Sequence, residues 1–201
     1  NFENEKHFID CYPFVPYQFS LFQSAIQNLS KHDAFEGRYS SVGERSMLAV
    51  FQQVAITVSN KTLGELATFD QMFDGIKLSL KTDIQNPIIK ASNNLSNPFA
   101  IRVLKALFLV KYVKEFKSTV RNITILMYSN FNENIQTLNE KVQEALNVLE
   151  QESYIQRTGD LYEFLTSKEQ DIETEIKGMD VDRDDIKNEL QKLIFDDILG
   201  N

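Results

Sequence analysis

The sequence is short of the residues that disulfides and metal sites need. Its 201 residues include one cysteine, Cys11, and two histidines, His7 and His32. A single cysteine excludes a disulfide within the chain and is typical of a reducing compartment, so we expect a cytoplasmic protein with Cys11 as a buried thiol. Neither histidine has a second histidine or a cysteine at ligand spacing, so the sequence predicts no zinc site.

Long apolar runs are also absent. No window approaches the ~18 consecutive apolar residues that a membrane-spanning helix needs, and no signal-peptide pattern follows Asn1. We therefore expect no membrane partner. The chain begins with Asn1 rather than methionine, which suggests a piece cut from a longer protein.

The motifs that mark common catalytic sites are missing as well. The sequence contains no G-x-x-x-x-G-K-[ST] and no G-x-G-x-x-G, so it cannot cradle a nucleotide by those routes. It contains no H-E-x-x-H, C-x-x-C or G-x-S-x-G. The acidic run at 169–185 lacks the ligand spacing and glycine of an EF-hand loop. We expect no catalytic residue, no metal ligand and no cofactor in this fragment, and therefore no enzyme activity of its own.

The charge that is present is unevenly distributed. The net charge is −8, but residues 150–201 hold fifteen acidic against six basic residues, a net of −9, so the other 149 residues carry about +1. Within 98–121 the acidic residue is Glu115, and the basic residues are Arg102, Lys105, Lys111, Lys114, Lys117 and Arg121. A basic segment before an acidic tail suggests two surfaces with different partners, or one surface masking the other.

Helical spacing of apolar residues dominates the chain, which predicts a mainly α protein. The expected helices cover about 17–29, 42–58, 63–80, 88–95, 98–117, 119–128 and 135–152. The helix at 98–117 is apolar around much of its circumference, so we expect it to be central, with its lysines either binding a partner or extending along its edges to solvent. The acidic tail is expected to hold one helix ending near Gly178 and another starting at 182–185.

One segment has the pattern of a β-hairpin. Tyr154 to Arg157 and Leu161 to Leu165 are rich in β-formers and flank a turn containing Gly159. Three helices followed by a hairpin is the order of a winged helix, with the 135–152 helix in the recognition position. The polar stretch ending at Pro98 favours a boundary, so we divide the chain into 1–95, a winged-helix domain at 96–166, and an acidic helical tail at 167–201.

The winged-helix order raises two alternatives, DNA binding and protein docking. The expected recognition helix carries several glutamates against Lys141, which is unfavourable for a phosphate surface. If DNA binds, we expect the contacts to come from Lys105, Lys111, Lys114, Lys117, Arg121 and Arg157. An acidic face and the apolar stripe of the tail fit docking to another protein, or to a second copy, better than they fit DNA.

The stretch FEGRYSSVGERSMLAVFQQ, residues 35–53, places an arginine at the start of a helix. Ser41 and Glu44 have capping-box spacing, so the helix is expected to begin there with Arg45 in its first turn. A cation in that position opposes the helix dipole. Two interpretations remain open: Arg45 pairs with a nearby carboxylate such as Glu36 or Glu44, or it reaches a phosphate across an interface.

Four runs of the sequence resemble one protein family. YPFVPYQFSLFQ (12–23), FEGRYSSVGERSML (35–48), FAIRVLKALFLVKYVKEFKSTVRNI (99–123) and EALNVLEQESYIQRTGDLYEFLT (144–166) are similar to the BrxC/PglY family. These are large P-loop ATPases of bacterial BREX and Pgl phage-defence systems. The resemblance implies an internal fragment of an ATPase that uses ATP and Mg²⁺, with the P-loop upstream of Asn1.

The arrangement also resembles, more distantly, the lid plus winged helix of origin-recognition-type AAA+ ATPases. There a G-x-x-R motif opens a lid helix, and its arginine senses the nucleotide phosphates. Gly43-Glu44-Arg45-Ser46 matches that motif, although the segment 60–95 is longer than a compact lid needs. The resemblance implies that 1–95 is lid-like and that Arg45 contacts phosphate in the full-length protein. The implied partners are the upstream nucleotide-binding domain, other BREX or Pgl subunits, or a second copy, with DNA as an alternative.

Overall fold

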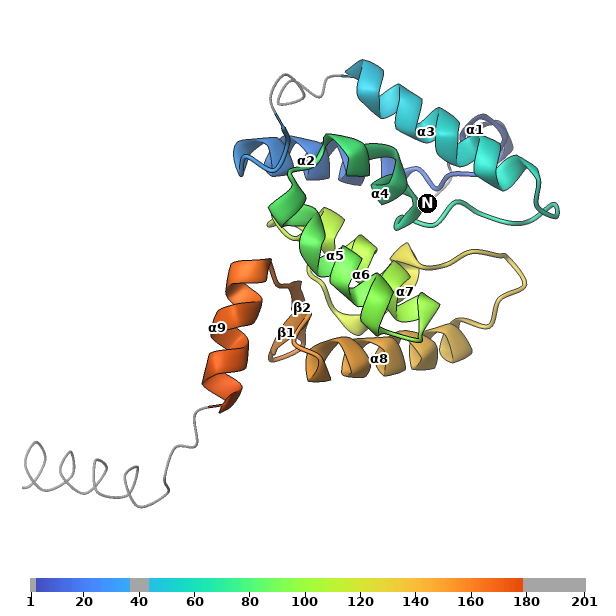
Figure 1. Cartoon of the computed structure of the whole chain (residues 1–201). Coiled ribbons are helices and arrows are strands. Elements are labelled where there is room, and N and C mark those ends of the chain that lie inside the picture. The colour runs from blue at the N-terminus through green and yellow to red at the C-terminus, as the bar shows by residue number, and fades with distance from the viewer. Residues whose placement is uncertain (1–2, 37–43, 179–201) are drawn as a thin grey trace, which may run out of the picture. The chain divides into compact units, whose positions relative to one another are not determined.

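The chain is mainly helical with a small antiparallel sheet, as the sequence predicts (Figure 1). A computed structural model describes residues 3–36 and 44–178. The described elements are α1 (Glu5–Cys11), α2 (Tyr17–Lys31), α3 (Glu44–Ser59), α4 (Gln71–Ile76), η2 (Lys77–Ser79), α5 (Thr82–Asn94), α6 (Pro98–Val110), α7 (Val120–Leu126), α8 (Ile135–Gln151), β1 (Ile155–Thr158), β2 (Leu161–Phe164) and α9 (Ser167–Gly178).

Helix α6 is the element on which the others pack. Asn97 caps it by accepting hydrogen bonds from the N–H groups of Phe99 and Ala100, and Pro98 occupies its first turn. Apolar residues cover most of its circumference and are buried, as expected for a central helix. It contacts α2, α4, α5, α7, α8 and β2. Figure 1 shows α2, α3 and α4 on one side of α6 and α8 on the other.

One hydrophobic core extends through both parts of the chain that we separated at residue 95. Phe22 of α2 and Phe69 belong to the same buried cluster as Leu104 of α6 and Leu146 of α8. Residues Asn1–Gln170 form one compact unit and Asp171–Asn201 a second. The core thus extends across residue 95, and the division of the chain at 95 and at 166 stays a prediction.

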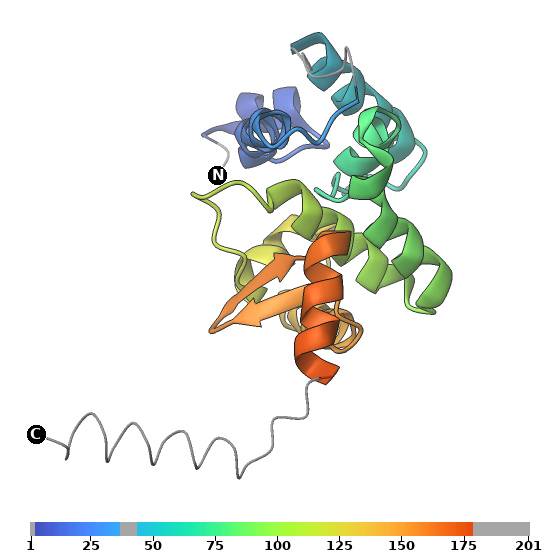
Figure 2. The same ribbon diagram turned by 60° about the vertical axis from the view of Figure 1, so that its left-hand side comes forward.

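The hairpin forms where the sequence places it. Strands β1 and β2 pair antiparallel, with Ile155 opposite Phe164 and Thr158 opposite Leu161 (Figure 2). Gly159 takes a φ of 61° in the connecting turn, a conformation that glycine adopts without steric cost. The inward-facing Phe164 packs edge-on against Phe108 of α6, which joins the sheet to the central helix. The order from α6 to β2 is therefore three helices and then a hairpin.

The expected helix across 63–80 is wrong in its first half. Helix α4 begins only at Gln71, and Gly64 has a φ of 98°. Between them, the backbone N–H groups of Leu66, Ala67 and Phe69 donate to the carbonyls of Ser129, Pro13 and Leu126. These long-range bonds, to the residues before α2 and to the end of α7 and beyond it, satisfy these backbone N–H groups without a helix.

Other helix boundaries also differ from the predictions. Helix α1 is not predicted, and α5 begins at Thr82 rather than near 88, with Pro87 inside it. Pro87 has no N–H to donate to the carbonyl of Asp83, and the hydroxyl of Ser167 lies 3.5 Å from that oxygen. Helix α6 ends at Val110 rather than 117 and continues as tight turns. The helix expected from 182–185 onwards lies outside the described residues.

Candidate functional site

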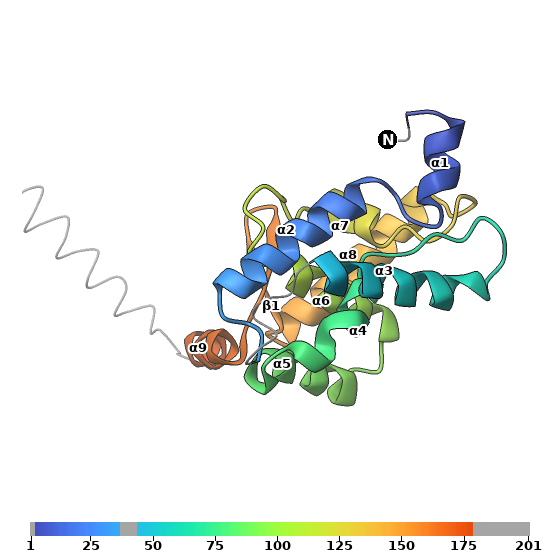
Figure 3. The same ribbon diagram turned by 90° about the horizontal axis from the view of Figure 1, so that it is seen from above.

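An open groove is lined by residues of α2, of α7 and of the segment 113–116 that precedes α7. Its volume is about 440 Å³. Figure 3 shows α2 and α7 from above. The lining residues of α2 recur at i, i+3, i+4 and i+7, and those of α7 at i, i+3 and i+4, so each helix presents one face to the groove. The lining consists of Tyr17, Ser20, Leu21, Ser24, Val113, Glu115, Phe116, Asn122, Ile125 and Leu126.

Tyr17 and Ile125 join this groove to a second hollow of about 330 Å³, because both residues line both cavities. The Tyr17 hydroxyl donates a hydrogen bond of 3.1 Å to the carbonyl oxygen of Ile125. Burial raises the pKa of Tyr17, so its hydroxyl stays protonated and a donor at neutral pH. The bond holds α2 against α7 at the point where the two hollows meet.

The second hollow is almost wholly apolar and is bordered by exposed side chains. Its lining is Val15, Tyr17, Leu66, Ile125, Tyr128, Phe131 and Ile135. Ile125 is 43% exposed, Phe131 47% and Ile135 49%. Single exposed apolar residues are ordinary on protein surfaces, and here three of them border one apolar hollow. We call the groove and this hollow together the α7 groove.

Three of the basic residues expected to contact DNA lie in or beside this region and remain available. Lys114, Lys117 and Arg121 are exposed, and none of them forms an ion pair with a residue in the described part of the chain. The side chain of Asn122 donates to the carbonyl of Lys117 at 2.8 Å, which fixes the basic segment to the start of α7.

Lys111 does not belong to an accessible basic surface. Its side chain is 2% exposed, and its ammonium lies 3.0 Å from a carboxylate oxygen of Glu163 and 3.0 Å from one of Glu169, and donates to the Phe164 carbonyl at 2.7 Å. Burial raises the pKa of Glu169, but hydrogen bonds from Thr166 and Lys111 outweigh it, and the net pKa is lowered. We therefore remove Lys111 from the DNA-contacting set.

The other residues predicted to contact DNA or phosphate are Lys105, Arg157 and Arg45. Lys105 is paired with Asp74 at 3.0 Å, which partly neutralises it. Arg157 is exposed in the hairpin, where its Nε donates to the Gly159 carbonyl and its guanidinium lies 5.5 Å from the ring centre of Tyr162. Arg45 is the second residue of α3, but its side chain lies outside the described part, so its phosphate-sensing role stays a prediction.

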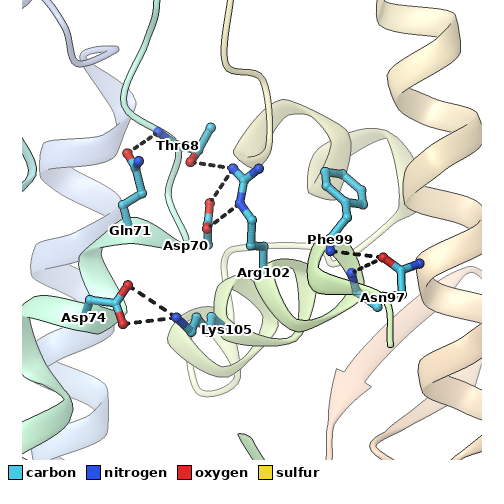
Figure 4. Close-up of polar contacts among 9 residues, drawn as sticks. Thr68, Asp70, Gln71, Asp74, Asn97, Phe99, Arg102 and Lys105 are labelled. Carbon is cyan, nitrogen blue, oxygen red and sulfur yellow. Dashed lines mark hydrogen bonds and ion pairs between the residues drawn. The ribbon is translucent and has the colours of Figure 1, made fainter. Parts of the chain in front are cut away.

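Nothing in the sequence distinguishes Arg102 from the other basic residues, but the structure places it in a specific network (Figure 4). Its Nε donates to Asp70 at 2.9 Å, and one terminal nitrogen donates to Asp70 at 3.3 Å and to the Thr68 hydroxyl at 2.9 Å. The side chain of Asp70 is 5% exposed. This two-point pair ties the 66–70 segment to α6 and has a structural role.

The outer face of α8 is acidic, as the sequence predicts. Glu140 and Glu144 are exposed there beside Lys141, while Leu138, Val142 and Leu146 are buried against the core. A helix in the recognition position of a DNA-binding winged helix needs to approach phosphates. The exposed carboxylates of α8 would repel them.

Neither a metal centre nor a membrane span is present in 3–36 and 44–178. No three His, Cys, Asp or Glu side chains among these residues gather as a metal site, and none of the described helices has the length and apolar character to cross a bilayer. A comparison with models of protein families finds no match for this chain. A search of solved structures finds none either.

Proposed function

We propose that this chain is a docking segment of a large bacterial ATPase of the BREX type, acting in the cytoplasm. The part up to α5 is lid-like, and α6 to β2 is a winged helix that binds another subunit of the same defence system. The family assignment rests on the four sequence runs. The docking role rests on one observation, the α7 groove with its exposed Ile125, Phe131 and Ile135.

Protein docking fits the charges better than DNA binding does. DNA contacts are dominated by cations that neutralise phosphates, and here Lys111 is buried and Lys105 is paired. The helix in the recognition position, α8, exposes Glu140 and Glu144 instead. A hollow lined by apolar side chains offers a protein partner desolvation energy that a phosphate backbone cannot gain.

Substituting an exposed apolar residue of the groove tests the docking role. Ile125→Asp places a carboxylate where the two hollows meet and should weaken binding to a partner subunit at least tenfold, since burying an unpaired charge is costly. Phe131→Ser is a second, milder variant. Ile56→Asp is the matched control, because Ile56 is a half-exposed isoleucine on α3. Binding of each purified subunit to the chain is measured by calorimetry.

The outcomes separate the candidate functions. Docking is supported if one subunit binds and Ile125→Asp and Phe131→Ser both weaken it while Ile56→Asp does not. It is refuted if no subunit binds at tens of micromolar, or if the groove variants behave like the control. Salt-sensitive binding of duplex DNA by the same chain, unaffected by Ile125→Asp, would favour the DNA-binding alternative.

Nucleotide coupling is tested in a protein extended upstream through the P-loop. Arg45→Ala should lower the rate of ATP hydrolysis by at least tenfold if its guanidinium contacts the phosphates, because a donor aimed at developing charge contributes about that much or more. Arg45→Lys, which keeps the charge but not the fork, should recover part of the rate. Wild-type hydrolysis in both variants would leave Arg45 as a residue paired with a local carboxylate.

A further inference from the structure

The three unpaired cations lie beside the lining of the α7 groove. Lys114 stands between Val113 and Glu115, Lys117 follows Phe116, and Arg121 precedes Asn122, and each of these four neighbours lines the groove. Glu115 is the acidic residue of the lining. Lys114 and Lys117 line a different cavity and Arg121 lines neither, so the three cations border the groove from the outer side of its wall, which we call the rim, in a chain whose overall charge is −8.

The segment 113–117 forms a ridge between the groove and a smaller cavity. Val113 and Phe116 line both, and the smaller cavity, of about 160 Å³, is also lined by Lys114 and Lys117. The ridge is held at both ends: the Tyr162 N–H donates to the Ser118 carbonyl at 3.0 Å, and Lys111 is anchored in the core. A ligand in the groove thus meets a fixed apolar wall with ammonium groups on its far side.

We propose that the α7 groove binds an acidic amphipathic helix of the partner subunit, an inference that rests on the docking function above. The apolar stripe of that helix fills the groove and the hollow on either side of Tyr17 and Ile125. Its flanking carboxylates pair with Lys114, Lys117 and Arg121. The three cations then supply the selectivity and the apolar lining supplies most of the affinity.

The form of the groove favours a helix over other ligands. Two of its walls are α2 and α7, and the face between two helices accepts a third whose side chains are spaced at i, i+3, i+4 and i+7. A nucleic acid strand would place phosphates on the cations but would leave the apolar lining without a partner. A basic helix would bring like charges onto the same rim.

A pair of synthetic peptides tests the charge of the occupant. Both are about 18 residues long with leucines at i, i+3, i+4 and i+7; one carries glutamates on the flanks and the other lysines. Fluorescence anisotropy with the full chain at low salt should give at least tenfold tighter binding of the acidic peptide. Binding should weaken as salt rises, since exposed ion pairs are screened.

Charge reversal at the rim is the matched test. Lys114→Glu with Lys117→Glu should weaken the acidic peptide about tenfold and improve the lysine peptide. The control is Lys90→Glu with Lys141→Glu, which makes the same charge change at two exposed lysines whose sequence neighbours do not line the groove. Arg121→Glu alone should give a smaller loss of the same sign. Circular dichroism confirms that each variant is folded.

The results distinguish this proposal from the one on which it rests. If a partner subunit binds and Ile125→Asp abolishes binding, but reversal at 114 and 117 has no more effect than the control, the docking function stands and the acidic helix is refuted. Equal binding of both peptides, or no binding of the acidic one at low salt, also refutes it. If Ile125→Asp has no effect on a subunit that binds, the docking groove itself is wrong.

Discussion

Removing Arg102 should destabilise the chain because it leaves a buried carboxylate without its charged partner. Asp70 is 5% exposed, and Arg102 makes the ion pair with it at 2.9 Å. Breaking a fully buried pair from one side costs about 3–5 kcal/mol. Arg102 itself is 39% exposed, so water entering the vacated space will recover part of this cost. We expect Arg102→Met to lower the free energy of unfolding by about 2–3 kcal/mol.

The same helix supplies the control. Lys105 lies one turn after Arg102 and pairs with Asp74, whose side chain is 49% exposed. Surface pairs contribute about 0.2–1 kcal/mol, so Lys105→Met should cost less than about 1 kcal/mol. Urea unfolding followed by circular dichroism measures both variants, with equal slopes confirming that the unfolded states are comparable.

A double-mutant cycle attributes the loss to the pair. Arg102→Met combined with Asp70→Asn should be more stable than Arg102→Met alone, because the neutral amide is less costly to bury than an unpaired carboxylate. The explanation fails if Arg102→Met costs no more than Lys105→Met, or if Asp70→Asn in the Arg102→Met background gives no recovery. Either result would mean that water already solvates Asp70.

Two further predictions concern pH and packing. The folded-state pKa of Glu169 is lowered below its ordinary 4.5, so its stabilising contribution is present above about pH 4.5 and is lost as pH falls through the folded value. Glu169→Gln should therefore reduce the dependence of the free energy of unfolding on pH in that window. An unchanged pH profile would contradict the Lys111 bridge. A Cβ at Gly75 would lie 2.8 Å from a methyl of Val50, so Gly75→Ala should lower the free energy of unfolding in urea by about 1–3 kcal/mol. Adding Val50→Ala should relieve this steric clash and recover part of the loss. A Gly75→Ala variant as stable as the wild type would show that α3 shifts freely.

Local sequence patterns were sufficient to predict the elements whose buried face is the apolar face defined by their own residues. Helices α2, α6, α7 and α8 start close to where capping residues and apolar spacing predict, and Asn97 and Asn134 cap α6 and α8 through their side chains. The hairpin follows from β-formers around Gly159. In each case most of the apolar face that the sequence defines is buried in the core.

The predictions of helix bounds failed where distant parts of the chain supply the hydrogen-bond partners of the backbone or the ion-pair partner of a charged side chain. Residues 63–70 have helical apolar spacing, but their N–H groups bond to carbonyls near 13 and 126–129. Helix α6 ends early as Lys111 turns into a pocket formed by Glu163 and Glu169, more than fifty residues away. No local pattern contains information about partners at that separation.

The features of the candidate site can also be separated into those that follow from the sequence and those that depend on the tertiary structure. The sequence by itself determined that 98–121 is basic and that the recognition-position helix is acidic, because the charge of a segment depends only on residues that are neighbours in the chain. Only the tertiary structure decided which cations are free, by burying Lys111, pairing Arg102 and Lys105, and leaving Lys114, Lys117 and Arg121 in solvent. It also decided that α2 faces α7 across a groove, since two segments a hundred residues apart are brought together by the core that they share with α6.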